Sequence, residues 1–300
     1  MLAEIFCQDS NCRIEAQGTL RSCPSPSPFW FLPGNPNDLA RTLRFSKKVT
    51  TRRFSYRAHS PEMSFWPCNS SSNEGLVKNL KRTGVVSSDA VFNAMLKTDR
   101  AKYLAQVETP DGGHVGELQA YQDVPHPIGY HQTISAPHMH AHAMELGYAA
   151  IKDVKHPRIL DVGAGSGYLT ACLGRMVEDK GGHVFGLEIV PGLVQFAKKN
   201  IQMADSDLID RGIVSVRCHN GWDGLPNEAP FHYIHVGAAA EVPPQALMEQ
   251  LADGGRLVLP LDEPRGGQIF VEITRHGINF SQRRLFGVCY VPLVRERKLS

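Results

Sequence analysis

The chain has 300 residues, enough for one large domain with appended segments or for two small domains. With 42% hydrophobic and 21% charged residues, it has the composition of a globular protein with ample material for a core. The formal net charge of +2, from 32 basic and 30 acidic residues, gives no whole-chain argument for a nucleic acid or an anionic membrane as partner, and no apolar run approaches the roughly 18 residues of a membrane span.

The first 62 residues differ in character from the rest. They contain CPSPSPFWFLPGNPND, which is too rich in proline for a helix or a central strand. Residues 39–60 carry seven basic side chains and no acid, with Ser and Thr interspersed, a composition similar to an organelle presequence. However, Glu4, Asp9 and Glu15 precede this segment. Three interpretations of residues 1–62 stay open: a disordered extension or misassigned start, a transit peptide, and a binding segment.

Helices are expected next, within residues 73–104. The segment NEGLVKNLKRTG has apolar residues at helical spacing and closes on Gly84. The segment SSDAVFNAMLKTDRAKYL begins with Ser88 or Asp89 as a cap and repeats the helical pattern to its end. After a loop rich in Pro, Gly and Asp, a third helix is expected over about residues 137–152.

From residue 158 onward, apolar strands alternate with helical segments. Strands are expected at 158–163, 183–190, 214–220, 231–238 and 256–261, and helices at 167–177, 191–204 and 243–252. This alternation predicts a doubly wound, mostly parallel sheet with right-handed crossovers. The last two strands, 268–277 and 280–293, have no helix between them and should pair antiparallel at the sheet edge. The chain is therefore expected to be an α/β protein with a helical part at 63–152, a Rossmann-like core at 153–262 and antiparallel strands at 263–300.

The cysteines give no sign of a disulfide framework or a zinc ribbon. There are seven, an odd number, and they are scattered and never spaced C-x-x-C. Cys172 and Cys289 lie in apolar stretches and are interpreted as small buried hydrophobic residues. A reducing compartment fits this pattern best.

The segment ILDVGAGSGYLT is the most informative motif. An apolar strand ends at Asp161, and a turn containing Gly163, Gly165 and Gly167 then enters a helix, which allows the backbone to approach a ligand closely. The spacing is G-x-G-x-G rather than the G-x-G-x-x-G of dinucleotide binding. The next strand ends at Glu188, well placed to accept from two ribose hydroxyls. Together these features predict an adenosine ligand without a pyrophosphate, which indicates S-adenosylmethionine; the alternative is a glycine-rich turn of another α/β protein.

The segment TISAPHMHAHAME contains three histidines at alternate positions, His138, His140 and His142. On a strand they would share one face and suit a metal ion. If a helix begins near Pro137, however, His138 and His142 share a face while His140 points elsewhere. No nearby cysteine or acidic cluster completes a metal shell. The pattern favours packed or hydrogen-bonded histidines, and no metal is expected.

Combined, these motifs resemble the protein-L-isoaspartate (D-aspartate) O-methyltransferase family over roughly residues 73–293. TISAPHMHA is similar to the family's own signature, LDVGAGSGYLTAC to its cofactor loop, and GVCYVPL to its C-terminal signature. The long segment APFHYIHVGAAAEVPPQALMEQLADGGRLVLP matches the second half of the family almost position by position. The resemblance implies an S-adenosylmethionine-dependent, Rossmann-like methyltransferase. Its substrates would be L-isoaspartyl and D-aspartyl residues of damaged proteins, which it methylates on the free carboxylate (the α-carboxylate of an L-isoaspartyl residue) and so directs through a succinimide to repair.

The resemblance also implies roles for individual residues. Ser135 corresponds to the family's catalytic serine, whose hydroxyl can hold the substrate carboxylate together with backbone N–H groups; a helix cap before Pro137 is the alternative role. The expected cofactor contacts are Gln132, Thr133, Ile134, His140, Asp161, Gly163, Gly165, Ser166, Gly167, Glu188, Leu193, Asn220 and Gly221. A carboxylate is already ionised at pH 7 and the methyl sulfonium is activated by its own charge, so no general base is required and orientation is the main task.

Two segments depart from the family pattern. The family usually has Gly-Asp-Gly-Arg after its third strand, whereas HNGW places Asn220 and Trp222 at the positions of the Asp and the Arg. Trp222 can pack on an adenine or fill the wall of the cleft. Val294 stands where the family usually carries a threonine. These departures concern cofactor affinity more than reaction type, and they leave open a weakened member that serves as a cofactor-binding adaptor, or a methyltransferase for another carboxylate.

The expected partners follow from the same resemblance. Damaged, isoaspartyl-containing proteins are the expected substrates, while neither nucleic acid nor membrane is expected as a partner. An RNA methyltransferase should show a basic stripe or stacking aromatic residues, and the regular region has no such stripe. A cytoplasmic monomer is expected, with organelle import through residues 1–62 as the alternative location.

Overall fold

The computed structural model describes residues 68–104 and 115–295, all of which belong to one unit of the chain. The expected extension over residues 1–62 and its three interpretations lie outside the described residues. Within the described part, no helix is long and apolar enough to cross a membrane.

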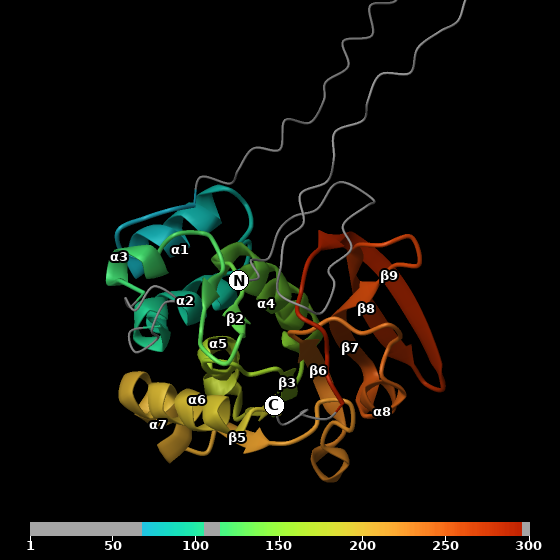
Figure 1. The fold of residues 1–300 in the computed structure, drawn as a ribbon. Helices are drawn as coiled ribbons and strands as arrows, with labels where there is room; N and C mark the ends of the chain where they lie inside the picture. The colour runs from blue at the N-terminus through green and yellow to red at the C-terminus, as the bar shows by residue number, and fades with distance from the viewer. Residues whose placement is uncertain (1–67, 105–114, 296–300) are drawn as a thin grey trace, which may run out of the picture. The chain divides into compact units, whose positions relative to one another are not determined.

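Seven strands form the main sheet, in the order β5-β4-β3-β6-β7-β8-β9 (Figure 1). Their bounds are β3 Arg158–Val162, β4 His183–Glu188, β5 Val214–Cys218, β6 Phe231–Val236, β7 Leu251–Asp262, β8 Gln268–His276 and β9 Asn279–Val288. The first five of this order pair in parallel, and β8 and β9 are antiparallel additions beside β7. The predicted α/β fold, with a mostly parallel sheet and an antiparallel C-terminal edge, is confirmed.

Four helices precede the main sheet in the described part of the chain, and four more lie between its strands in sequence. Their bounds are α1 Asn73–Arg82, α2 Asp89–Lys97, α3 Glu117–Ala120, α4 Pro137–Ile151, α5 Tyr168–Val177, α6 Pro191–Ala204, α7 Ser206–Asp210 and α8 Gln245–Glu249. Short 3-10 helices lie at η1 Arg100–Tyr103, η2 Glu178–Lys180 and η3 Pro226–Glu228. A separate two-stranded antiparallel ribbon pairs β1 His126–Pro127 with β2 Thr133–Ile134.

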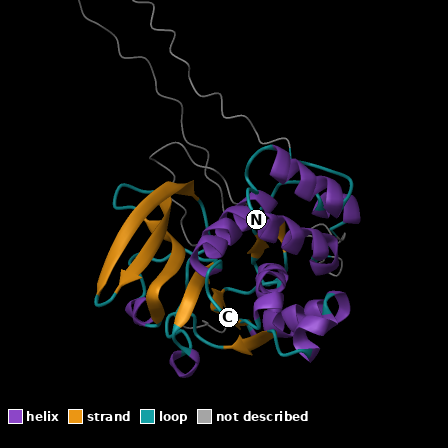
Figure 2. Cartoon of the chain, turned by 180° about the vertical axis from the view of Figure 1, so that it is seen from behind, coloured by secondary structure: helices purple, strands orange, loops and turns teal. Residues whose placement is uncertain are grey.

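Neighbouring residues of the parallel strands point to opposite faces of the sheet and belong to two different hydrophobic clusters. Ile159 of β3 belongs to the cluster that contains the buried faces of α1 to α7, whereas the next residue, Leu160, belongs to a second cluster with Leu247 of α8. Figure 2 shows the larger group of helices together on one side of the strands. Because both faces are covered, the parallel strands are apolar almost throughout, and this explains why they could be recognised as continuous apolar runs.

One expected helix is interrupted. The pattern predicted one helical segment within residues 87–104, capped at Ser88 or Asp89, but α2 ends at Lys97. The backbone of Thr98 is extended, with φ −99° and ψ 99°, and its carbonyl oxygen accepts a hydrogen bond from the side-chain amide of Asn73 at 3.4 Å. Asp99 then caps η1 by accepting from the backbone N–H two residues further on, at 3.1 Å. Side chains that satisfy backbone groups in this way compete with helical hydrogen bonds, so the helix breaks here.

The expected helix at 243–252 is also shorter than predicted. Only Gln245–Glu249 is helical, and the strand begins at Leu251, so β7 includes the DGG segment at residues 253–255, between the expected helix and the expected strand. The pairing of β7 with β6 shifts register at this point, and Gly254 has a φ of 75°. A bulge of this kind absorbs extra residues without ending the strand.

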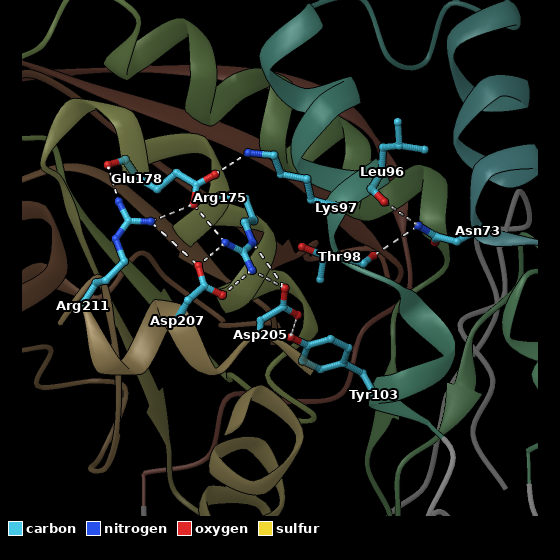
Figure 3. A network of polar contacts seen from close by, with 10 residues as sticks. All are labelled: Asn73, Leu96, Lys97, Thr98, Tyr103, Arg175, Glu178, Asp205, Asp207 and Arg211. Carbon is cyan, nitrogen blue, oxygen red and sulfur yellow. Dashed lines mark hydrogen bonds and ion pairs between the residues drawn. The ribbon is translucent and has the colours of Figure 1, made fainter. Parts of the chain in front are cut away.

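A partly buried ion-pair network joins α2, α5 and α7 (Figure 3). The guanidinium of Arg175 donates to the carboxylates of Glu178, Asp205 and Asp207 at 2.9, 2.7 and 2.6 Å. Lys97 donates to Glu178 at 2.6 Å. The side chains of Glu178 and Asp205 are only 5% and 3% exposed, so these carboxylates depend on their cationic partners for stabilisation.

We expect Arg175→Gln to lower the free energy of unfolding by about 3–5 kcal/mol, because it removes the cation shared by the buried carboxylates of Glu178 and Asp205. Burial acts to raise the pKa of Glu178, but the hydrogen bonds from Lys97 and Arg175 outweigh it, so that the pKa is below its ordinary value. The stabilisation is therefore complete above the ordinary glutamate pKa and is lost as the pH falls through the lowered one. Urea unfolding at pH 7 and below pH 4 measures this; an equal loss at both pH values would contradict it.

Candidate active site

The turn after β3 requires glycine at three positions. Gly163, Gly165 and Gly167 have φ values of 84°, 52° and 86°, in the left-handed region that glycine adopts without steric cost. The backbone N–H groups of Gly163 and Ala164 both donate to the carbonyl oxygen of Leu187, at 2.8 and 2.9 Å. The turn is thus fixed against the end of β4, at the carboxyl edge of the sheet where α/β proteins bind their ligands.

Glu188, the last residue of β4, lies directly against this turn. One carboxylate oxygen accepts from the backbone N–H of Gly165 at 3.1 Å and the other from that of Val190 at 3.0 Å. Burial raises the pKa of Glu188, although the backbone hydrogen bonds act to lower it. The structure therefore brings the expected ribose-binding acid and the glycine turn into direct contact.

Asp161 supports the turn from behind. Its two carboxylate oxygens accept from the hydroxyl of Thr170 at 2.6 Å and from Nδ1 of His235 at 2.8 Å. The residue is 1% exposed, and its partners come from α5 and β6. Asp161 thus ties three elements together beneath the turn, and its direct contact with a cofactor stays a prediction.

Ser166 and Leu193 also lie in supporting places. Both are buried, and the carbonyl oxygen of Ser166 accepts from the side-chain amide of Asn200 on α6 at 2.9 Å. Leu193 is fully buried in the core, near the start of α6. This arrangement does not test whether Ser166 and Leu193 contact a cofactor, so both contacts stay predictions.

The β1–β2 ribbon carries the other expected contacts to the same edge. A Cβ atom on Gly165 would lie 3.0 Å from Cδ1 of Ile128, and one on Gly192 would collide with the ring of Tyr130. The ribbon is therefore packed on the glycine turn and on the start of α6. Residues 132–134 are its second arm, with Gln132 and Thr133 half-buried and Ile134 buried, and Ser135 follows them directly.

The start of α4 shows that Ser135 does not occupy the cap position. Ala136 is the N-cap residue and has no side chain that can cap. The carboxylate of Asp123 accepts instead from the backbone N–H of His138, at 2.9 Å. This role of Asp123 was missed by the sequence analysis, because the acid lies 15 residues before its partner and only the folded chain brings the two together.

The three histidines contact three different partners. Nδ1 of His138 lies 2.9 Å from the carboxylate of Asp123, and Nδ1 of His140 lies 3.3 Å from the guanidinium of Arg100. The ring of His142 packs on Phe286, with centroids 5.2 Å apart. Burial, and next the charge of Arg100, hold the pKa of His140 well below its ordinary value. Among the described residues, no group of three His, Cys, Asp or Glu side chains could hold a metal ion.

The turn after β5 closes against the C-terminal segment. The side-chain oxygen of Asn220 accepts from the backbone N–H of Trp222 at 3.1 Å, and the indole N–H of Trp222 donates to the carbonyl oxygen of Leu293 at 2.9 Å. The guanidinium carbon of Arg295 lies 3.8 Å from the centroid of the Trp222 ring. A Cβ on Gly221 would lie 2.4 Å from Val162, at the end of β3. These contacts favour the second of the two roles considered for Trp222, in the wall of the cleft.

This edge of the sheet therefore brings together the structural features that a methyl transfer to a carboxylate needs. It offers a turn whose backbone can be approached closely, a buried acid beside it and, on a packed ribbon, a serine hydroxyl. A side-chain carboxylate is ionised at neutral pH, so the arrangement can act by orientation without a general base.

Comparisons with known proteins identify the family to which the chain is similar. Residues 71–298 match the family model described as Protein-L-isoaspartate(D-aspartate) O-methyltransferase. A protein-L-isoaspartate O-methyltransferase of Caenorhabditis elegans is 38% identical over 228 residues, covering 76% of this chain and 95% of that protein. One from Triticum aestivum is 41% identical over 233 residues, covering 76% and 94%.

A solved structure with a similar fold carries the same family description. A Plasmodium falciparum chain described as a protein-L-isoaspartate O-methyltransferase, crystallised in complex with S-adenosyl-L-homocysteine, superposes with a TM-score of 0.65. The two chains are 35% identical, and the match covers 76% of this chain and all of that one.

The assignment of Glu188 can be tested by cofactor binding. Glu188→Ala should weaken the affinity for S-adenosylhomocysteine by about 2–4 kcal/mol, because two charge-assisted hydrogen bonds to ribose hydroxyls are lost. Glu188→Gln keeps the shape and one acceptor, so it should lose less. Titration calorimetry gives the affinities, and Glu263→Ala, on a loop before β8, serves as the control. Unchanged affinity in Glu188→Ala would disprove the assignment.

Proposed function

This chain belongs to the protein-L-isoaspartate(D-aspartate) O-methyltransferase family, and we propose that it methylates the free carboxylate of L-isoaspartyl and D-aspartyl residues in damaged proteins, which in an L-isoaspartyl residue is the α-carboxylate. The methyl donor is S-adenosylmethionine. The resulting ester closes spontaneously to a succinimide, whose hydrolysis returns part of the damaged residues to normal aspartyl. The observation that carries this proposal is the contact between the ribbon that leads to Ser135 and the glycine turn beside Glu188.

The residues of the turn fit this cofactor. The three left-handed glycines place bare backbone at the carboxyl edge of the sheet, and the carboxylate of Glu188 stands beside them as an acceptor for ribose hydroxyls. Asn220 and Gly221 form the adjoining turn after β5. When bound, S-adenosylmethionine supplies a methyl group that is already activated by the sulfonium charge.

The protein's own residues then have to hold the substrate carboxylate in line with the methyl group. Ser135 supplies a hydroxyl that donates to one carboxylate oxygen, and the neighbouring backbone N–H groups can donate to the other. No residue has to remove a proton, because the carboxylate is already ionised at pH 7. The rate enhancement therefore comes mainly from alignment of the reacting atoms.

The substrate class has structural consequences. An isoaspartyl residue arises by deamidation or isomerisation in exposed, flexible segments, so the cleft should be open and tolerant of sequence. We propose in addition that the enzyme acts as a monomer, on protein rather than nucleic acid, and in the cytoplasm. The near-balanced charge of the chain supports the choice of protein over nucleic acid; import into an organelle through residues 1–62 is the alternative location.

A second candidate function rests on the turn after β5. Asn220 replaces the family's aspartate and Trp222 its arginine, so a weakened member that acts as a cofactor-binding adaptor is the alternative. One assay distinguishes the enzyme from the adaptor. Radiolabelled S-adenosylmethionine offered with an isoaspartyl peptide and with its normal aspartyl twin should label the first peptide only, whereas an adaptor labels neither.

Ser135→Ala should lower methyl transfer to an isoaspartyl peptide by ten- to a thousand-fold, about 1.4–4 kcal/mol in the barrier. Cofactor affinity should change little. The melting temperature should also be nearly unchanged, because Asp123 rather than Ser135 caps α4. Single-turnover rates and thermal unfolding of the same preparation measure both effects. Ser135→Thr keeps the hydroxyl and should be less impaired than alanine. A normal rate in Ser135→Ala would exclude the catalytic role.

Asn220→Asp restores the family's charged acceptor and should tighten cofactor binding by about 1 kcal/mol, because a carboxylate makes the stronger hydrogen bond. Calorimetry with S-adenosylhomocysteine measures the change. The carboxylate can still accept from the backbone N–H of Trp222, so the turn should be preserved. Weaker binding would show that Asn220 belongs to a differently arranged pocket.

A further inference from the structure

The most deeply buried charged side chain near the site belongs to Arg100, in η1. It is 0% exposed. Burying a guanidinium is costly unless its surroundings are polar, so its contacts have to offset a large loss of hydration. Nη2 donates to the carbonyl oxygen of Ser135 at 2.8 Å, and Nη1 lies 3.3 Å from Nδ1 of His140. The guanidinium carbon is 5.3 Å from the centroid of the Tyr168 ring.

We propose that Arg100 is a positioning residue for methyl transfer, which holds the backbone of Ser135 against the helix that leaves the glycine turn. Tyr168 is the first residue of that helix, directly after Gly167. One guanidinium thus contacts both the segment that holds the substrate and the element that follows the cofactor turn. The proposal rests on the proposed function, because it assigns to Ser135 the role of holding the substrate carboxylate.

The contact with Ser135 acts on the position of its hydroxyl. The carbonyl oxygen is attached to the backbone beside the Cα atom that bears the side chain. A fixed carbonyl direction restricts rotation of the backbone at Ser135, and the hydroxyl is then presented from one position. Displacements of about 1 Å are enough to cost large factors in rate when catalysis depends on orientation.

The contact with His140 fixes the protonation state of that ring. A guanidinium can only donate, so Nδ1 of His140 has to be unprotonated to accept. Burial and the charge of Arg100 both lower the pKa of His140, which favours the neutral ring. His140 also packs on Tyr168, with ring centroids 5.2 Å apart. Arg100, His140 and Tyr168 therefore form one packed group behind Ser135.

The position of η1 is also fixed through Tyr103, whose contact with Asp205 is drawn in Figure 3. The hydroxyl of Tyr103 donates to Asp205 at 2.6 Å, within the ion-pair network of Arg175. The side-chain amide of Asn200 donates to the carbonyl oxygen of Ser166 in the glycine turn at 2.9 Å, and lies 3.5 Å from that of Tyr103. Arg100 therefore belongs to an element, η1, that is linked to the glycine turn through Asn200.

The chain offers a control in Arg158, at the start of β3, which is partly exposed and forms an ion pair with the carboxylate of Glu228 at 2.7 Å. Its guanidinium also donates to a backbone carbonyl, that of Glu228 at 2.7 Å, and also lies over an aromatic ring, that of Phe185 at 5.1 Å. It lies at the amino end of the strand, opposite the glycine turn. Loss of Arg158 should therefore lower stability without affecting the site.

The test compares Arg100→Gln and Arg100→Lys with Arg158→Gln, in the full chain and at a temperature where all are folded. With isoaspartyl peptide and S-adenosylmethionine both saturating, kcat should fall ten- to a hundred-fold in Arg100→Gln. It should fall less in Arg100→Lys, which keeps the charge and one donor. In Arg158→Gln, kcat should stay within twofold of the unmodified chain even though its melting temperature falls. A normal kcat in folded Arg100→Gln, or an equal loss in Arg158→Gln, overturns the proposal.

Amide hydrogen exchange of residues 133–142 gives a readout that does not depend on activity. Exchange should be faster in Arg100→Lys and Arg100→Gln and unchanged in Arg158→Gln. If Arg100→Gln fails to fold, kcat and amide hydrogen exchange of Arg100→Lys decide whether the positioning role holds. If the unmodified chain does not methylate the peptide, the proposed function fails, while faster exchange confined to the Arg100 variants still supports the positioning role. Unchanged exchange in both Arg100 variants overturns that role.

Discussion

The architecture depends on the left-handed turn that follows β3. Three glycines allow the backbone to reverse closely enough for its N–H groups to bond to the end of β4, and for Gly165 to meet the carboxylate of Glu188. Side chains at these positions would be strained by the backbone conformation, and at Gly165 also crowded by Ile128 of the ribbon. The turn thus sets where the helix α5 begins, where the ribbon packs and where a ligand can approach the sheet.

Buried charges are distributed around this turn so that each has a defined partner. Asp161 is held by a hydroxyl and an imidazole, Glu188 by backbone N–H groups, and Asp205 by Arg175. Arg100 is held by a carbonyl oxygen and an aromatic face. Such groups are costly to bury, and breaking one contact leaves its partner unsatisfied. They therefore fix the relative positions of the elements more strictly than apolar packing alone would, which suits a reaction that works by alignment.

The departures from the family pattern are concentrated where the turn after β5 meets the C-terminal segment. Asn220 retains an acceptor, which in the structure closes its own turn onto the backbone of Trp222. Trp222 bonds to Leu293 and stacks with Arg295, while Gly221 packs against the end of β3. The substitutions are thus confined to one local closure of the cleft wall, which adjoins Glu188 through the hydrogen bond from the backbone N–H of His219 to the carbonyl oxygen of Glu188, at 3.1 Å.

The sequence by itself determined the parallel core, the antiparallel edge and helix α4, because buried strands and amphipathic helices leave local, periodic patterns of apolar residues. It also determined the glycine turn and the acid at the end of β4, and through the family resemblance it predicted a catalytic role for Ser135. Only the tertiary structure decided the features that join residues distant in the sequence. The break at Thr98 depends on the amide of Asn73, the cap of α4 on Asp123, and the backbone of Ser135 on Arg100. Each is a single polar contact across 15 to 35 residues, and such a contact imposes no periodicity on the chain that carries it.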